Sequence, residues 1–170
     1  MCDQILTLIT PSLNRLIDIW LDEDIGRGDL TGSVLIHQQS SAHWISKQPG
    51  VFCGGRIVQH IFQRLDQSID INLIIKDGES FTSNQKLLEL SGPAPSLIAG
   101  ERTALNIAMH LSGISTTTAK LVATLKGTGV RLADTRKTTP GLRTLEKYAV
   151  RCGGGINHRM GLYDAILIKD

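Results

Sequence analysis

Hydrophobic residues in the first half of the chain follow helical spacing in some segments and strand-like alternation in others. Pro11 after Thr10 is typical of a helix start, and apolar residues then recur at helical spacing as far as Leu21. Residues 55–65 carry a second apolar helical face. Segments with the pattern of strands, in which β-branched residues alternate with polar ones, are residues 42–48, 69–79 and 86–92. This half therefore predicts helices combined with an antiparallel sheet.

The pattern changes after Pro95. Residues 97–113 and 115–127 predict two consecutive helices, the second opened by the N-cap candidates Ser115 and Thr116. A strand at 130–134, a helix at 141–153 and a strand at 165–169 then predict a βαβ unit with parallel strands. We expect a domain boundary near 105–115.

Basic residues follow both predicted parallel strands. Arg136 and Lys137 come after the first, and Lys169 ends the second. Parallel strands of one sheet end at the same edge, where ligand sites of α/β proteins lie. These three cations are therefore predicted to share one rim. His158 and Arg159 lie in the loop that returns to the second strand, so topology alone does not place them at that rim.

Charge and composition narrow the possible functions. The net charge is +2, but residues 131–170 hold 8 Lys/Arg against 4 Asp/Glu, and residues 1–130 hold 10 against 12. A short basic segment in a chain with 4% aromatic residues favours a local anion site over a nucleic-acid surface. The three cysteines have neither zinc-ligand spacing nor an even number. With no apolar run as long as a membrane span and no basic leader, we expect a cytoplasmic protein.

Three motifs carry a family resemblance. They are the long run from Asp134 to Asp170 that begins DTRKTTPGLR, the upstream ERTALN, and EDIGRGDLT near the start. Together they resemble quinolinate phosphoribosyltransferases over nearly the whole chain. The resemblance implies an α+β N-terminal sandwich domain, residues 1–110, followed by the first part of a parallel (β/α) barrel domain, residues 111–170.

The activity implied by this resemblance is that of a pentosyltransferase of NAD biosynthesis. Quinolinate and 5-phosphoribosyl-1-diphosphate would be converted to nicotinate mononucleotide, pyrophosphate and CO2. Both substrates are multiply anionic, and arginine binds carboxylates with two parallel hydrogen bonds. Residues matching the family's substrate-binding positions are Arg102, Thr135, Arg136, Lys137, His158, Arg159 and Lys169.

Among these residues, Lys137 and Lys169 are expected to supply the electrostatic catalysis. Arg102 matches an arginine that reaches the neighbouring subunit's site, which implies a homodimer or a larger oligomer.

The resemblance also implies Mg²⁺, but the Glu and Asp expected to hold the metal and the ribose, and the loops expected to hold phosphate, are missing from this chain. We therefore expect the chain to be inactive alone. Two alternatives stay open. One is a related phosphoribosyltransferase-like protein associated with molybdenum transport, and the other is a non-catalytic fragment that binds dicarboxylates.

Overall fold

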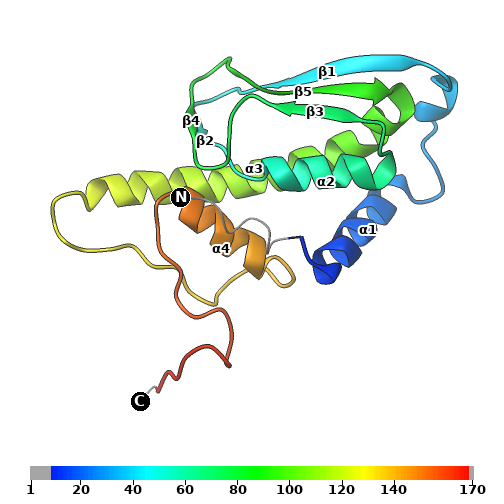
Figure 1. Ribbon diagram of the computed structural model, residues 1–170. Helices are drawn as coiled ribbons and strands as arrows, with labels where there is room; N and C mark the ends of the chain where they lie inside the picture. Colours follow the sequence, from blue (N-terminus) through cyan, green and yellow to red (C-terminus); the bar gives the residue numbers. More distant parts are fainter. Residues whose placement is uncertain (1–8, 169–170) are drawn as a thin grey trace.

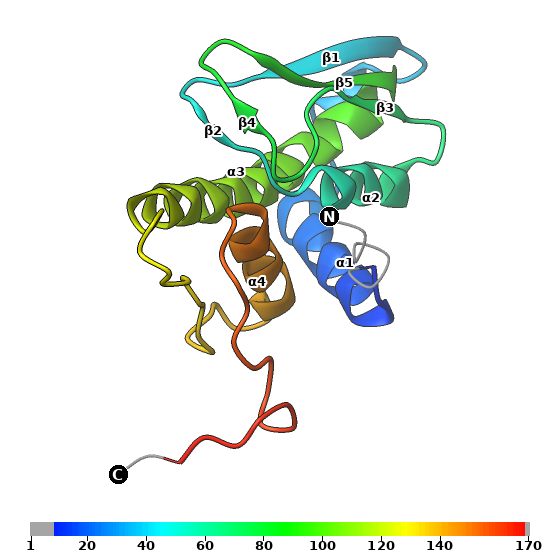
Figure 2. The same ribbon diagram turned by 60° about the vertical axis from the view of Figure 1, so that its left-hand side comes forward.

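The computed structural model describes residues 9–168 as layers of sheet and helix. A three-stranded sheet lies over helices α2 and α3, and helices α1 and α4 lie on the far side of these two (Figures 1 and 2). In chain order the elements are α1 (Pro11–Ile25), a short 3-10 helix (Gly32–Val34), β1 (Gln39–Ile45), β2 (Gly50–Val51), α2 (Gly55–Leu65), β3 (Asp70–Leu73), β4 (Ser80–Phe81), β5 (Lys86–Pro93), α3 (Ala94–Thr124) and α4 (Arg143–Cys152).

The first predicted helix is confirmed as α1. The Thr10 side chain caps it by accepting the N–H of Leu13, and Pro11 occupies the first turn, where its missing N–H costs nothing. Leu13, Ile17 and Leu21 are buried at helical spacing. The helix continues through Asp22, Glu23 and Asp24 and ends at Ile25, where the N–H of Gly26 caps it by donating to the carbonyl of Asp22.

The predicted antiparallel sheet is also confirmed. Its order is β1-β5-β3, with both neighbours antiparallel to the central strand. Leu88 of β5 lies opposite Trp44 on one side and Leu73 on the other. Strands β2 and β4 form a separate two-stranded pair. The bounds differ from the predicted 42–48 and 69–79, since β1 covers Gln39–Ile45 and β3 only Asp70–Leu73.

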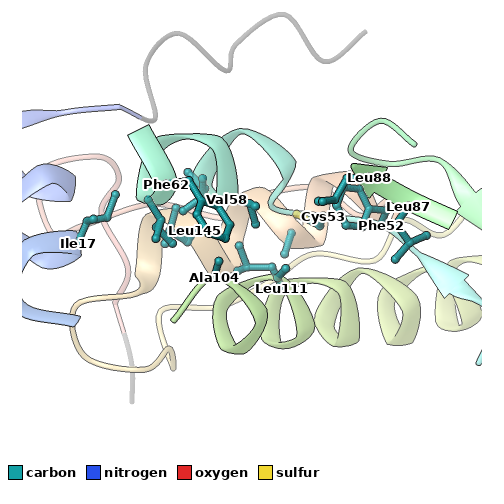
Figure 3. Close-up of a cluster of buried hydrophobic side chains, with 14 of the residues drawn as sticks. Ile17, Phe52, Cys53, Val58, Phe62, Leu87, Leu88, Ala104, Leu111 and Leu145 are labelled. Carbon is teal, nitrogen blue, oxygen red and sulfur yellow. The ribbon is translucent and has the colours of Figure 1, made fainter. Parts of the chain in front are cut away.

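The core extends from this sheet through α2 and α3 to α1 and α4, and it includes Leu88, Ile17 and Leu145 (Figure 3). Helix α2 occupies the predicted residues and contributes Ile57, Val58, Ile61 and Phe62. At Gly100 of α3 a methyl group would approach the Phe62 ring to 2.7 Å. Glycine at this position lets α2 and α3 pack closely.

The two helices predicted for residues 97–127 are wrong, because a single helix of 31 residues, α3, runs without a break from Ala94 to Thr124. The N-cap candidates make tertiary hydrogen bonds instead. Buried Ser115 Oγ donates to the carbonyl of Ala149 at 2.8 Å, and Thr116 Oγ1 accepts the N–H of Val51 at 2.9 Å. Local sequence could not distinguish a cap from these partners.

The two predicted parallel strands are likewise not formed among residues 9–168. Of the first, only an isolated parallel bridge remains, Ala133 to Ile156. Residues 165–168 form no strand, and Ile166 and Ile168 are about nine-tenths exposed, at 91% and 88%. Parallel strands need adjacent strands and cover on both faces, and neither is present beside residues 165–168 in the described part of the chain. The predicted helix between them is confirmed as α4.

Candidate functional site

Asp134 and Lys147 form a buried ion pair at the centre of the basic segment. Lys147 lies on the buried face of α4 and is 1% exposed. Its Nζ donates to Asp134 Oδ1 and, at 2.9 Å, to the carbonyl oxygen of His158. A buried ammonium group without a partner would destabilise the fold. Because the partner of Lys147 is Asp134, the ion pair holds the chain at residue 134 against α4.

The same carboxylate holds the second loop. Asn157 Nδ2 donates to Asp134 Oδ2 at 2.6 Å, and the backbone N–H of His158 donates to Oδ1 at 2.7 Å. Asn157 also donates to the carbonyl of Lys147 at 2.8 Å. Asp134 therefore fixes the start of the 135–142 loop and the 156–159 segment to one helix.

Arg143, the first residue of α4, is bonded to both loops. Its Nε donates to Thr138 Oγ1 at 3.1 Å, and its Nη2 donates to the carbonyl of Arg136 at 3.3 Å. Its Nη1 donates across to the carbonyl of Met160 at 3.1 Å. The half-buried guanidinium thus links the segment containing Arg136 to the segment beside Arg159.

A hollow of about 470 Å³ opens beside this network. Its lining includes Lys147, Arg151, His158, Arg159 and Asp164. Arg159 Nη1 donates to the carbonyl of Ala165 at 2.8 Å. The Nδ1 of His158 accepts the N–H of Arg159 at 2.8 Å, so the neutral imidazole carries its proton on Nε2 and can donate from it. His158 Nε2 and the other guanidinium N–H groups of Arg159 are the donors that the hollow can offer an anion, beside the carboxylate of Asp164.

The other predicted site residues that the structure describes lie outside this lining. Thr135 Oγ1 accepts the N–H of Lys137 at 3.0 Å, and Lys137 is exposed. Arg136 is half-buried, and its Nε is shielded from solvent without a hydrogen-bond partner among the described residues. Arg102 is exposed on α3, and Lys169 falls outside the described residues.

A second buried polar group ties α4 to the sheet side of the molecule. The carboxylate of Asp77 accepts the N–H groups of Gly54 and Gly55 and the hydroxyl of Tyr148, each at 2.9 Å. Burial raises the pKa of Asp77, and hydrogen bonds from Gly55, Tyr148 and Gly54 partly oppose the rise. Burial, together with the nearby Asp77 charge, raises the pKa of Tyr148. The cluster joins α4 to the turns at Gly54 and Asp77, and its Tyr148 also lines the hollow.

Comparison with known families assigns both halves of the chain. Residues 29–112 match the family model of the quinolinate phosphoribosyl transferase N-terminal domain, and residues 114–170 match that of its C-terminal domain. The chain belongs to the quinolinate phosphoribosyltransferase family. The predicted fold class is confirmed: the N-terminal domain of this family is followed by the start of its C-terminal domain. The two matches meet within α3, which continues from one into the other.

Individual relatives agree with the family assignment. The chain is 47% identical over 159 residues to a probable nicotinate-nucleotide pyrophosphorylase [carboxylating] of Bacillus subtilis, which covers 93% of this chain and 55% of the relative. It is 37% identical over 164 residues to quinolinate phosphoribosyltransferase [decarboxylating] 1b of Nicotiana tabacum, covering 95% of this chain and 46% of that one. The chain thus spans about half the length of the curated relatives it matches.

Solved structures of the family share the fold. The nicotinate-nucleotide pyrophosphorylase from Francisella tularensis superposes with a TM-score of 0.89 at 40% identity, covering 94% of this chain and 59% of that chain. NadC from Streptococcus pyogenes gives a TM-score of 0.90 at 40% identity, covering 95% and 59%. The layered arrangement described above is therefore that of the family.

The family resemblance also implied magnesium, which can be compared with the residues present. Between residues 9 and 168, no group of three or more His, Cys, Asp or Glu side chains is arranged to hold a metal ion. The described residues therefore do not fit a magnesium site of their own.

Between residues 9 and 168, no helix combines the length and the apolar character needed to cross a membrane.

Sequence reasoning assigned no role to three residues that organise the site: Arg143, Lys147 and Asn157. One signal was present for Lys147. It lies beside Leu145, Tyr148 and Ala149, which are buried on α4, and a lysine there needs a buried partner. Asp134 is the acidic residue next to the cations in the quoted motif, but its partner could not be identified without the tertiary structure.

Proposed function

We propose that this chain supplies the quinolinate-binding part of a quinolinate phosphoribosyltransferase site. The reaction joins the ring nitrogen of quinolinate to the ribose of 5-phosphoribosyl-1-diphosphate, expels pyrophosphate and releases the 2-carboxylate as CO2. Family membership of both chain segments is the observation that carries this proposal. The relatives named above, which are pyrophosphorylases or quinolinate phosphoribosyltransferases, favour it over the molybdenum-transport alternative.

The proposed roles follow the charge of the substrates. Arg136, His158, Arg159 and Lys169 would bind the quinolinate carboxylates, and Thr135 would lie beside them. The unpaired, shielded Nε of Arg136 supports such a role, because a buried guanidinium donor is stabilised when it gains an acceptor. The donors that Arg159 and His158 present at the hollow support it as well.

Catalysis in this proposal is electrostatic. Ribosylation makes the pyridine nitrogen cationic, and this charge stabilises the carbanion left when CO2 departs. The protein orients two anions and neutralises the charge that develops on pyrophosphate, which is the kind of stabilisation that preorganised cations provide. Lys137 and Lys169 are proposed for this role. Exposed Lys137 is free to approach the phosphoribosyl substrate.

Several parts of the complete activity are proposed to come from outside this chain. Arg102 is exposed on α3, where it is available to a neighbouring subunit's site in a homodimer or larger assembly. Magnesium would accompany the diphosphate substrate, since no group of three or more potential metal ligands is assembled between residues 9 and 168. The chain alone is therefore expected to bind quinolinate without forming nicotinate mononucleotide. Its proposed location is the cytoplasm.

Isothermal titration of the purified chain tests this proposal. Quinolinate and 5-phosphoribosyl-1-diphosphate are titrated separately, and we expect quinolinate to bind the more strongly of the two. Arg136→Ala and Arg159→Ala should each weaken quinolinate binding about tenfold or more, the loss of one charge-assisted carboxylate contact.

Arg27, an exposed arginine far from residues 134–160 in sequence, provides a matched control for loss of one positive charge. Arg27→Ala should bind like the unaltered chain. The Arg102→Ala variant by itself should bind quinolinate weakly. Mixed with Arg159→Ala it should recover part of the binding, because mixed dimers hold one intact shared site. No quinolinate binding by the unaltered chain would refute the proposed function.

A further inference from the structure

Arg143 occupies a position that helix energetics disfavour. It is the first residue of α4, where the positive end of the helix dipole repels a cation. Basic residues are ordinarily favourable at the opposite end of a helix, where α4 has Arg151. A guanidinium at this end therefore needs a compensating interaction.

All three hydrogen-bond acceptors of Arg143 described above are uncharged. They are the Thr138 hydroxyl and the carbonyl oxygens of Arg136 and Met160. Within residues 9–168, the ion pairs do not include Arg143, and the nearby carboxylate of Glu146 is bonded to His110 and to the N–H of Thr139. The hydrogen bonds satisfy the guanidinium without cancelling its charge.

Those acceptors come from the two segments that carry the proposed quinolinate residues. The first segment supplies the carbonyl of Arg136 and the hydroxyl of Thr138. The second supplies the carbonyl of Met160, the residue directly after Arg159. No backbone ladder joins these segments beyond the bridge at Ala133 and Ile156 in the described chain. Farther from that bridge, Arg143 supplies a direct link between them.

We propose that Arg143 is a positioning residue, which holds the Arg136–Lys137 segment beside the His158–Arg159 segment and adds positive charge for one dianionic ligand. The inference rests on the proposed function for the identity of that ligand. The planar fork of arginine can address three acceptors in different directions at once, whereas the single ammonium of lysine cannot reproduce that geometry. Arg143→Lys therefore keeps the positive charge but loses the link between the two segments, whereas Arg143→Ala loses both.

Hydrogen exchange without ligand tests the link itself. Arg143→Ala and Arg143→Lys are compared with the unaltered chain and with Arg15→Ala. Arg15 is an exposed arginine of α1 whose side chain is bonded to Ser12 of the same helix. We expect about tenfold faster exchange in both residues 135–142 and residues 157–162 for the two Arg143 variants, since each loses tertiary bonds that limit local opening. Unchanged exchange in either segment would overturn the proposal.

Quinolinate titration tests the consequence for binding. Arg143→Ala should bind at least about tenfold more weakly than Arg15→Ala, and Arg143→Lys should fall between them because it keeps the charge. Guanidinium chloride at about 50 mM, far below unfolding concentrations, should restore binding to Arg143→Ala more than sodium chloride at the same concentration does. Selective rescue would show that a guanidinium group at this place, and not ionic strength, restores quinolinate binding.

The outcomes separate the two proposals. If the unaltered chain fails to bind quinolinate, the proposed function fails, and the exchange measurements still decide whether Arg143 joins the segments. If the unaltered chain binds and Arg143→Ala binds equally well, Arg143 is not a positioning residue. Equal rescue by both salts would also contradict the inference.

Discussion

The sheet region and the basic C-terminal segment are stabilised by different means. Residues 39–93 close an antiparallel sheet by backbone ladders, and its central strand places Leu88 in the core. The described residues after α3 have one isolated bridge, and their loops are held to α4 by the side chains of Asp134, Arg143, Lys147 and Asn157. The sheet region is stabilised largely by burial of apolar surface, which does not depend on the orientation of single groups. The C-terminal segment depends on a few specific hydrogen bonds and one ion pair.

Removal of the central carboxylate should produce the largest effect. Asp134→Ala leaves Lys147 charged and buried, which costs about 3–5 kcal/mol of folding free energy. Urea unfolding measures the loss. The double variant Asp134→Ala, Lys147→Met should be more stable than Asp134→Ala, because it removes the unpaired ammonium.

The exposed pair of Asp18 and Arg64 is the matched control, since both side chains are about half exposed, at 46% and 51%. Asp18→Ala should leave the urea midpoint almost unchanged. Equal effects of Asp18→Ala and Asp134→Ala would contradict the view that the buried pair organises the second region.

An aliphatic truncation in each region sharpens the comparison. Leu88→Ala should cost about 2–5 kcal/mol, because Leu88 is fully buried and its loss leaves a cavity. Ile166→Ala, at a side chain 91% exposed, should change stability by less than about 0.5 kcal/mol. Thermal or urea unfolding of both variants gives the test. A large cost at Ile166 would mean that residues 165–168 are packed in solution.

The smallest expected effect is the pH dependence contributed by Asp77, at the junction of the two regions. Its pKa is raised in the folded protein above the ordinary value of 3.8. The folded state therefore binds this proton more tightly than the unfolded chain does. The stabilisation is complete below the ordinary pKa and declines as the pH rises through the raised pKa. The total loss is about 1.4 kcal/mol for each pH unit that separates the folded and unfolded pKa values.

Asp77→Asn removes this titration and keeps an oxygen that can accept from Gly54 and Gly55. The stability of the unaltered chain relative to Asp77→Asn, measured by urea unfolding, should fall as the pH rises from the ordinary pKa of 3.8 through the raised pKa of the folded state. A constant difference, or one that grows with pH, would show that the Asp77 charge is not destabilised by burial.

Prediction from sequence succeeded where the local sequence pattern and the packing in the folded protein favour the same structure. Thr10 and Pro11 specify the start of α1, and the apolar face of residues 55–65 becomes α2 without a shift. It failed at Ser115 and Thr116, whose hydroxyls suit a cap as well as the long-range partners Ala149 and Val51. It failed again at residues 165–168, because an apolar strand pattern does not supply the neighbours that a parallel strand needs.

The candidate site shows the same division. Motifs in the sequence were enough to indicate the family and to name Arg136, His158 and Arg159 as binding candidates. They did not reveal that Arg143 bonds both loops, because its three acceptors lie on residues 136, 138 and 160. Two of those acceptors are backbone carbonyls, which every residue carries and no side-chain pattern can mark.

The sequence by itself determined the helices α1, α2 and α4, the presence of an antiparallel sheet, where positive charge concentrates and which family the motifs resemble. These properties are local, since they depend on the order of residue types along the chain. The tertiary structure alone decided that α3 runs unbroken between the two domain matches and that Lys147 pairs with Asp134. Those outcomes depend on which distant groups meet in a water-poor interior, where an unpaired charge or hydroxyl is costly and a matched one is stable.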